Sequence, residues 1–247
     1  MMSSLELKLS ERDICFDRNG NRVRCFPHVI NIAVKTGLSF VTTLPSLRDG
    51  DTDDDGQYRD ALASDLIARV RHLVNLCRAS GNRRDDFRKT VLGENATGND
   101  IDDADDILLD RVVVLLRDVD TRWSSTFFMV DRFLELYPAI QRFIENDTKL
   151  SNSELFSSVE LEALNDIREF LHTFHSIQEL ASAEKTPTLS IVLPLYEGLI
   201  EILELMKDKL PNLSHIIDVS LDKLREYLNK ARSTHIYGLA MGMFLPL

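Results

Sequence analysis

The second half of the chain repeats apolar residues at the spacing of amphipathic helices. Three long helices are indicated there, and each presents one face of large apolar side chains that folding should bury. These faces are made by Leu161, Leu164, Ile167, Leu171, Phe174 and Ile177, by Leu189, Leu193, Tyr196, Ile200, Leu203 and Met206, and by Ile216, Leu221, Leu224 and Leu228. Short connections between helices make neighbours antiparallel. The sequence therefore predicts a helical bundle, in a chain of 247 residues that is long enough to bury a sizeable core.

The only tryptophan, Trp123, lies in a polar stretch at residues 117–126, just before another helical pattern. Thr121, Ser124 and Ser125 can each accept a hydrogen bond from the amides of a first helical turn. We therefore expect a helix to start here. Taken alone, the tryptophan is most simply a core residue beside surface charges, because indole side chains are mostly buried.

Apolar runs flank this stretch on both sides. Residues 107–116 predict a buried helix rather than a strand, because the run is long and contains Asp110 and Arg111. On the other side, the helix after Trp123 is expected to continue to Tyr137. Pro138 then removes an amide and should kink the helix or restart it.

The N-terminal part predicts one strand followed by one helix. Residues 1–20 lack periodicity and end in a turn signal, while residues 22–26 alternate polar and apolar side chains as a short strand does. Pro27 can occupy the first position of a helix that runs towards Gly37, because its missing amide costs nothing there. A single strand is not a sheet, so its hydrogen-bonding partners would have to come from elsewhere.

The acidic residues 49–56 superficially match a calcium-binding loop. Asp51, Asp53 and Asp55 fall where such a loop places its first ligands, but Leu62 stands where the bidentate glutamate is needed. We therefore interpret this segment as a solvated linker.

A helix is predicted from Leu62 to Cys77 and is stopped by Gly81. The following residues 82–89 mix both charges, and the basic residues are balanced too closely to make a phosphate-binding patch. Residues 93–106 are rich in Gly, Asn and Asp without periodicity, so an exposed loop is expected there.

The overall composition favours an intracellular protein. The net charge of −11 disfavours broad binding to nucleic acids unless the basic groups cluster. Three widely spaced cysteines without a CxxC pair favour reduced thiols. The N-terminus lacks the pattern of a secretory signal, and no apolar run approaches the length of a membrane span. We expect no membrane partner.

A zinc site is one alternative for Cys25 and His28, whose spacing suits a metal. Four ligands are needed, and His172 and His175 could complete the set only if the fold brought them close. The preferred interpretation is that Cys25 is a buried thiol and that His28 caps or bridges backbone groups between strand and helix.

Four short blocks give the chain a specific resemblance to a known family. They read RCFPHVINI, DTRWSST, TPTLSIVLPLY and IYGLA, at residues 24–32, 120–126, 186–196 and 236–240. In this order they resemble the C-x-x-H-x-x-N-[LI], T-R-W-[NS]-S-T, P-T-L-x-x-x-x-P-L-Y and I-Y-x-[LI]-A motifs of the hAT superfamily of DNA transposases. The resemblance covers roughly residues 21–245.

The resemblance implies a mainly α fold, in which a helical insertion domain is attached to a remnant of an RNase H-like α/β core. Carried onto this chain, it predicts the following segments: an irregular N-terminus at 1–20, the core remnant at 21–48, a helix with acidic mobile loops at 49–106, the helical insertion domain at 107–235, and a truncated return to the core at 236–247.

The family cuts DNA with three carboxylates that hold two divalent metal ions, Mg²⁺ or Mn²⁺. The resemblance places all three carboxylates outside this chain. Asp13 and Asp17 lack the sequence context of the family's second aspartate, and Glu201 and Glu204 belong to the polar side of a helix. We therefore expect no enzyme activity, no catalytic or metal-binding residue, and no cofactor.

The resemblance also implies that Arg122 and Trp123 contact DNA ends, since an indole can stack on a distorted base and a guanidinium can neutralise phosphate. The alternative is that Trp123 only packs between helices while Arg122 pairs with Asp118 or Asp120. The acidic surface favours this alternative. The remaining motif residues are expected to be structural, and they are Cys25, His28, Asn31, Thr121 and Ser125.

Taken together, the sequence predicts a degenerate or domesticated fragment of a hAT-type transposase, located in the nucleus, with weak residual DNA contact at most. A second hypothesis belongs to a different class. The apolar residues 236–247 and an exposed apolar edge could bind another protein or a second copy of the chain.

Overall fold

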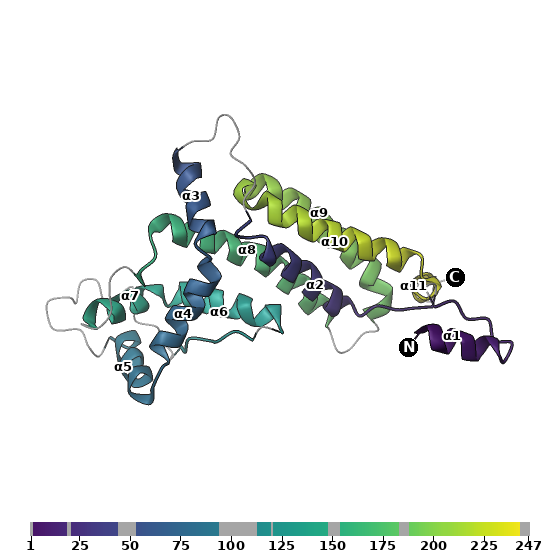
Figure 1. Cartoon of the computed structure of the whole chain (residues 1–247), viewed down its shortest axis with the longest axis horizontal. Coiled ribbons are helices and arrows are strands. Elements are labelled where there is room, and N and C mark those ends of the chain that lie inside the picture. Colours follow the sequence, from purple (N-terminus) through teal and green to yellow (C-terminus); the bar gives the residue numbers. More distant parts are fainter. Residues whose placement is uncertain are drawn as a thin grey trace. The chain divides into compact units, whose positions relative to one another are not determined.

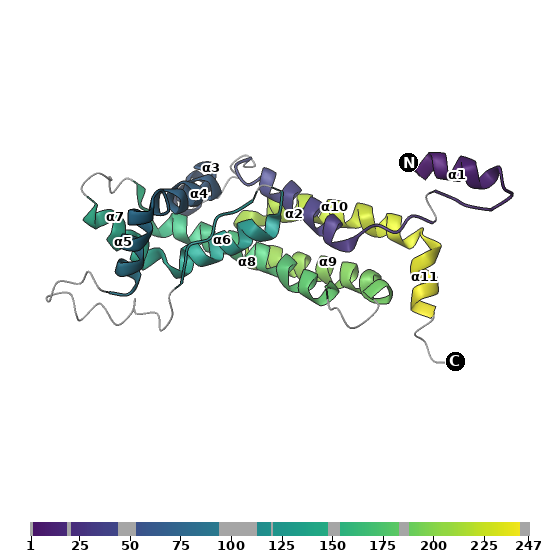
Figure 2. The same ribbon diagram turned by 90° about the horizontal axis from the view of Figure 1, so that it is seen from below.

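The computed structural model describes residues 2–18, 21–43, 53–93, 113–119, 121–147, 154–182 and 188–242. These residues form α-helices joined by turns and short 3-10 helices, without a β-sheet (Figures 1 and 2). The only bridge between extended residues in this part is an isolated one, between Val119 and Arg122. The predicted mainly α fold is confirmed. None of the described helices combines the length and the apolar character that crossing a bilayer requires.

The chain separates into two compact units. The first unit comprises Met1–Phe40 with Phe170–Leu247, and the second comprises Val41–Glu169. The boundary falls within helix α8 (Ser158–Ala181). The segment predicted as a helical insertion domain, residues 107–235, is thus shared between the two units.

The first unit is built around α10, which lies along α2 and α9 (Figures 1 and 2). Each of these helices buries one apolar face, as the periodicity predicts. The elements of this unit, besides the C-terminal part of α8, are α1 (Met2–Ser10), α2 (Phe26–Ser39), η3 (Thr188–Ile191), α9 (Val192–Lys209), η4 (Pro211–Leu213), α10 (Ser214–Arg232) and α11 (His235–Gly242).

Helices α2 and α10 approach so closely that one position admits only glycine. A Cβ atom on Gly37 would lie 2.3 Å from the Ser220 hydroxyl oxygen and 3.1 Å from the Ile216 carbonyl oxygen. Ser220 is fully buried, and its hydroxyl donates a 3.1 Å hydrogen bond to the carbonyl of Ala33. A backbone carbonyl of α2 thus receives a buried donor from α10, and the absent side chain at Gly37 makes room for it.

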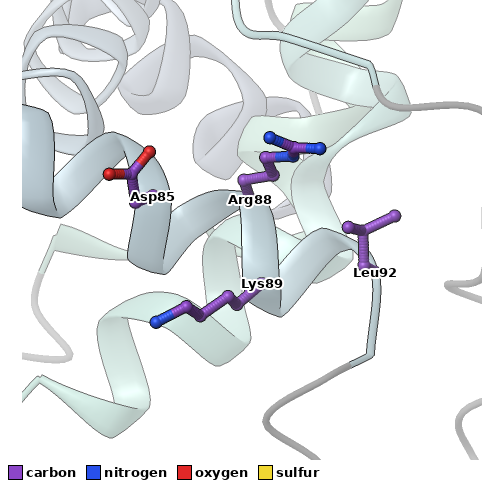
Figure 3. A pocket seen from close by; sticks show the side chains of 4 residues that line it. All are labelled: Asp85, Arg88, Lys89 and Leu92. Atoms are coloured by element: carbon purple, nitrogen blue, oxygen red, sulfur yellow. The ribbon is translucent and has the colours of Figure 1, made fainter.

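The second unit contains helices from both sides of the tryptophan stretch. Its elements, besides the N-terminal part of α8, are α3 (Asp53–Ala63), α4 (Leu66–Cys77), α5 (Gly81–Val91), an extended segment at residues 113–119, α6 (Trp123–Glu135) and α7 (Tyr137–Asn146). The separation of α6 from α7 at Leu136 confirms the restart that Pro138 predicts. On α5, the side chains of Asp85, Arg88 and Lys89 border a cavity of about 300 Å³, together with Leu92 just after the helix (Figure 3).

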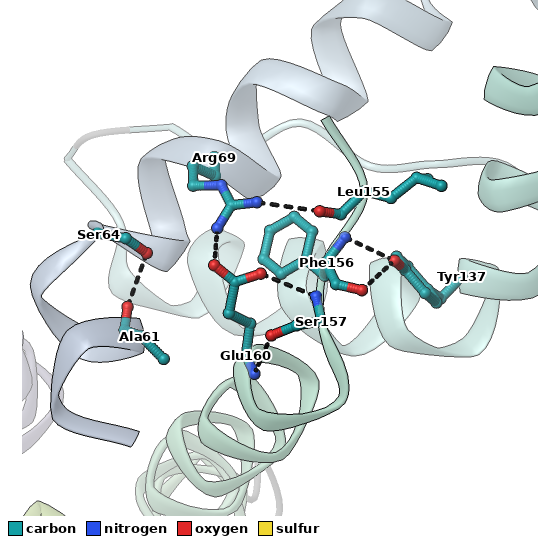
Figure 4. A network of polar contacts seen from close by, with 8 residues as sticks. All are labelled: Ala61, Ser64, Arg69, Tyr137, Leu155, Phe156, Ser157 and Glu160. Carbon is teal, nitrogen blue, oxygen red and sulfur yellow. Dashed lines mark hydrogen bonds and ion pairs between the residues drawn. The ribbon is translucent and has the colours of Figure 1, made fainter. Parts of the chain in front are cut away.

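The start of α8 is held by a network of side-chain hydrogen bonds (Figure 4). Ser157 and Glu160 form a capping box, in which each side chain accepts from the other residue's amide at 3.2 and 2.8 Å. The Tyr137 hydroxyl accepts from the Phe156 amide at 2.7 Å and donates to the Phe156 carbonyl at 3.0 Å. Arg69 donates to Glu160 and lies over the Phe156 ring, 4.3 Å from its centroid.

Two predictions for the N-terminal part are wrong. Residues 22–25 are not a strand, and α2 begins at Phe26 with Pro27 in its first turn. Met2–Ser10 forms the helix α1, where irregular structure was expected, although this helix buries no residue. The alternation at 22–26 therefore marks an extended approach to α2 without sheet pairing.

Two predicted helices of the second unit also differ. The expected single helix from Leu62 to Cys77 is broken between α3 and α4. There Asp65 takes a left-handed conformation, and its carboxylate accepts from the Ala68 amide at 3.1 Å. Residues 113–116, expected to be helical, are extended and alternate between buried and exposed side chains. Residues 107–112 and 94–106 lie outside the described residues.

Gly37→Ala is expected to lower the free energy of unfolding by about 1–3 kcal/mol, because the added methyl group would displace Ser220 or the α10 backbone. Gly198→Ala is the matched control, since a methyl group there meets nothing within 4 Å. It should instead stabilise the protein by up to about 1 kcal/mol through helix propensity. Denaturant unfolding followed by circular dichroism measures both, and equal effects would contradict the close approach.

Candidate functional site

Three of the four motif blocks meet in the first unit. Phe26, from the first block, packs edge to face against Tyr196 of the third, with ring centroids 4.8 Å apart. Tyr237, from the fourth block, donates its hydroxyl to the Arg24 carbonyl at 3.1 Å. All three aromatic rings are buried, and burial raises the pKa of the Tyr196 and Tyr237 hydroxyls. The motif aromatics therefore build a packed junction between the start of α2, α9 and α11.

The polar residues of the first block lie on the outside of this junction. Cys25 is the N-cap residue of α2, but it is exposed and its side chain makes no capping hydrogen bond. His28 is exposed and Asn31 is half-buried. The interpretation of Cys25 as a buried thiol is therefore wrong, because the chain reaches α2 along the surface rather than within a sheet.

In the part of the chain that the structure describes, the ligands that zinc or the family's metal ions would need do not come together. Within the described residues, no group of three or more His, Cys, Asp or Glu side chains could hold a metal ion. Cys25, His28, His172 and His175 thus do not form a set of ligands. Glu204 pairs instead with Lys207 and Arg225 on the outer side of α9. No cluster of side chains in the described ranges fits a two-metal centre.

The second block forms a tight turn that leads into α6. Arg122 donates its amide to the Val119 carbonyl at 2.9 Å. The Ser125 hydroxyl accepts from the Val119 amide at 2.7 Å and donates to the Arg122 carbonyl at 2.6 Å. Ser125 thus fixes the turn that precedes the helix, rather than capping the first helical amides as expected. Thr121 is exposed, and Asp120 lies outside the described residues.

Trp123, the first residue of α6, is a core residue. Only 3% of its surface is exposed, and it shares the buried face of the helix with Phe127 and Val130. Arg122, in contrast, is exposed. Of the proposed DNA-contact pair, Arg122 is therefore on the protein surface and Trp123 is buried beneath it.

Asp118 is paired with Arg71, an arginine 47 residues away in the sequence. Its carboxylate accepts three hydrogen bonds from the Arg71 guanidinium of α4, at 2.9, 3.1 and 2.6 Å, and its side chain is only 5% exposed. The alternative in which Asp118 neutralises Arg122 is therefore wrong. A cavity of about 240 Å³ lies beside this pair and is lined by Arg71, Val74, Asn75, Arg117, Asp118 and Met129.

These features describe, for the part of the chain that the structure covers, a mainly helical protein of two compact units in which the motif aromatics serve mainly in packing. The chain belongs to the family of the ZBED1 RNase-like helical domain, whose model matches residues 23–170. This match confirms a hAT-related helical region, without extending to a whole transposase. No curated protein and no solved structure matches the chain.

Trp123→Ala is expected to lower the free energy of unfolding by about 3–5 kcal/mol, the scale of removing a buried indole. Phe128→Ala, on the exposed side of the same helix, is the control and should cost about 1 kcal/mol, since 42% of that residue is exposed. Chemical denaturation of the full chain measures both. Unchanged stability in the tryptophan variant would contradict its role in packing.

Two of the three thiols are expected to react in the folded protein. Cys15 and Cys25 are exposed, whereas burial raises the pKa of the Cys77 thiol to about 12 and keeps it protonated. A chromogenic disulfide reagent at mildly alkaline pH should therefore modify two cysteines at once and the third only in denaturant. Cys25→Ser should leave one reactive thiol. A single fast thiol in the unmodified sequence would restore the buried interpretation of Cys25.

Proposed function

We propose that this chain is a hAT-related helical scaffold that does not cleave DNA, in keeping with a domesticated or degenerate transposase part acting in the nucleus. The observation that carries the proposal is the use of the carboxylates. Within the described residues, aspartates and glutamates of the second unit neutralise arginines one by one. A two-metal cleavage centre needs the opposite arrangement, with several carboxylates converging on one point.

The second unit illustrates this use of carboxylates. Asp118 receives Arg71, Asp131 receives Arg168, Asp147 receives Arg83, and Glu160 receives Arg69. Each pair joins two different helices or segments, so the charges stabilise the fold. The proposal needs no metal ion and no cofactor in this chain.

Contact with DNA ends through the second block is a weaker part of the proposal. Arg122 is exposed and its guanidinium can reach a phosphate. Stacking by Trp123 would first require the start of α6 to open, because the indole is buried in the helical core. We therefore propose that Trp123 supports the turn that presents Arg122.

A protein-binding role is the alternative proposal. On α11, Leu239 is 69% exposed and Met241 is also exposed, which supports an apolar surface near the C-terminal motif block. Residues 243–247, which the sequence analysis included in that surface, lie outside the described residues. Concentration-dependent self-association without DNA would favour this alternative.

Incubating the purified full chain with hairpin or terminal-repeat DNA and Mg²⁺ or Mn²⁺ tests the main proposal. No nicking above the protein-free control is expected, because no described carboxylates converge on a metal site. A helical circular dichroism spectrum must accompany the assay to show that the chain is folded. Strand cleavage that a chelator abolishes would overturn the proposal.

A further inference from the structure

The segment that forms α4 and α5 is locally basic in an acidic chain. Residues 66–93 contain seven Arg or Lys and two Asp. Four of the seven cations are neutralised by carboxylates: Arg69 by Glu160, Arg71 by Asp118, Arg83 by Asp147, and Lys89 by Asp86 at 3.7 Å. The acids in these ion pairs are the local Asp86 and three carboxylates from outside the segment, and three arginines remain.

The remaining arginines, Arg78, Arg84 and Arg88, form no ion pair within the described part of the chain, and neither does Arg117 of the extended segment. Arg78 donates through Nη1 to the Leu115 carbonyl, which ties the end of α4 to this extended segment. Its Nε atom is buried and has no hydrogen-bond partner among the described residues. The fold therefore gathers positive charge here from two separate stretches of sequence.

The pKa of Arg78 also reflects the positive charges around it. Burial lowers the pKa of its guanidinium, and the positive charges of Arg117 and Arg84 lower it further. An arginine remains charged at neutral pH in spite of such a shift, so Arg78, Arg84 and Arg117 repel one another in the folded protein. A bound anion would relieve this repulsion.

The geometry offers an anion both a row of cations and a recess. Arg117 lines the cavity beside the Arg71–Asp118 pair together with Asn75, whose exposed amide can donate a hydrogen bond. Arg84 and Arg88 are four residues apart, and hence about 6 Å apart on one face of α5. The row therefore runs from Arg117 past Arg78 to α5. At the α5 end, Asp85 borders the same cavity as Arg88 (Figure 3).

We infer that Arg117, Arg78, Arg84 and Arg88 form a binding site for the phosphodiester backbone of a nucleic acid, on the second unit. Guanidinium groups hold phosphate oxygens through paired hydrogen bonds. A row of cations matches a linear polyanion, whereas a single free phosphate would need the same groups to converge on one point. Phosphate contacts position a nucleic acid without reading its sequence.

The acidic overall charge does not oppose such a site at physiological salt. Charges farther away than about 10 Å are largely screened at 0.1 M ionic strength. The expectation that residues 82–89 are too balanced for a phosphate patch is thereby revised, because Lys89 occupies Asp86 while Arg78 and Arg117 join from outside that segment. The site uses neither Trp123 nor Arg122, so it stands independently of the proposed function.

The test is binding of the full chain to a fluorescent duplex of about 20 base pairs, followed by anisotropy between about 50 and 200 mM salt. Affinity should fall steeply with salt. The double variant Arg84→Gln with Arg117→Gln should weaken binding about tenfold or more and reduce the salt slope by about 2, close to 1 for each phosphate contact. Arg84→Lys with Arg117→Lys, which keeps the charge, should retain most of the affinity.

The matched control is Arg225→Gln with Arg232→Gln. It removes the same charge from exposed positions of α10, and it should change affinity less than twofold. Melting curves must show that each variant is folded. Equal weakening by both pairs would mean that net charge alone acts, and would overturn the site, as would an absence of salt-dependent binding.

Two competitors separate the phosphodiester backbone from other anions. Inorganic phosphate at millimolar concentration should leave most of the duplex bound, because the row needs several phosphates in line. Complete displacement would overturn the row in favour of a single-anion site. An acidic peptide that binds as tightly, with the same dependence on Arg84 and Arg117, would show that the surface serves a protein partner instead.

Discussion

The three hydrogen bonds between Arg71 and Asp118 determine much of the second unit. They fasten the extended segment 113–119 to α4 through a carboxylate that is almost completely buried. Removal of either partner would leave the other charge buried and unpaired, which is far more costly than the loss of an exposed ion pair. The position of Arg117 and of the turn at Val119 both follow from this attachment. A single buried pair thus connects the packing of Trp123 with the charged surface beside it.

The helices could be predicted because burial imposes a period of 3.6 residues on their sequences. Short apolar runs carry less information, since a buried strand and a buried helix look alike over a few residues. Residues 113–116 were predicted as helix for this reason, yet Val113 and Leu115 point into the core while Val114 and Leu116 are exposed. The alternation at 22–26 predicted a strand, but residues 22–25 form no strand. There the Arg24 carbonyl is satisfied by the Tyr237 hydroxyl, a partner more than 200 residues away.

The candidate residues could be located from the motif blocks, but their roles could not. The burial of Trp123 and the exposure of Cys25 depend on how α6 and α2 pack, and the residues adjacent in the sequence do not determine that packing. The row of arginines could not be predicted from the balance of charges within a segment, because ion pairs join residues that are far apart in the sequence. Only the folded structure shows that Asp147 and Asp118 neutralise Arg83 and Arg71, and that Arg117 comes to lie near Arg78.

The division of the first unit into two stretches of chain has a consequence for synthesis on the ribosome. Ala33 and Ser220, joined by a buried hydrogen bond between α2 and α10, are 187 residues apart. At typical translation speeds of about 5–20 residues per second, α2 leaves the ribosome on the order of 10 to 40 s before α10 exists. Its apolar face, with Val29, Ile30 and Val34, is exposed during that interval. The second unit is synthesised earlier, so its residues are all available for folding before α2 gains its partner helix.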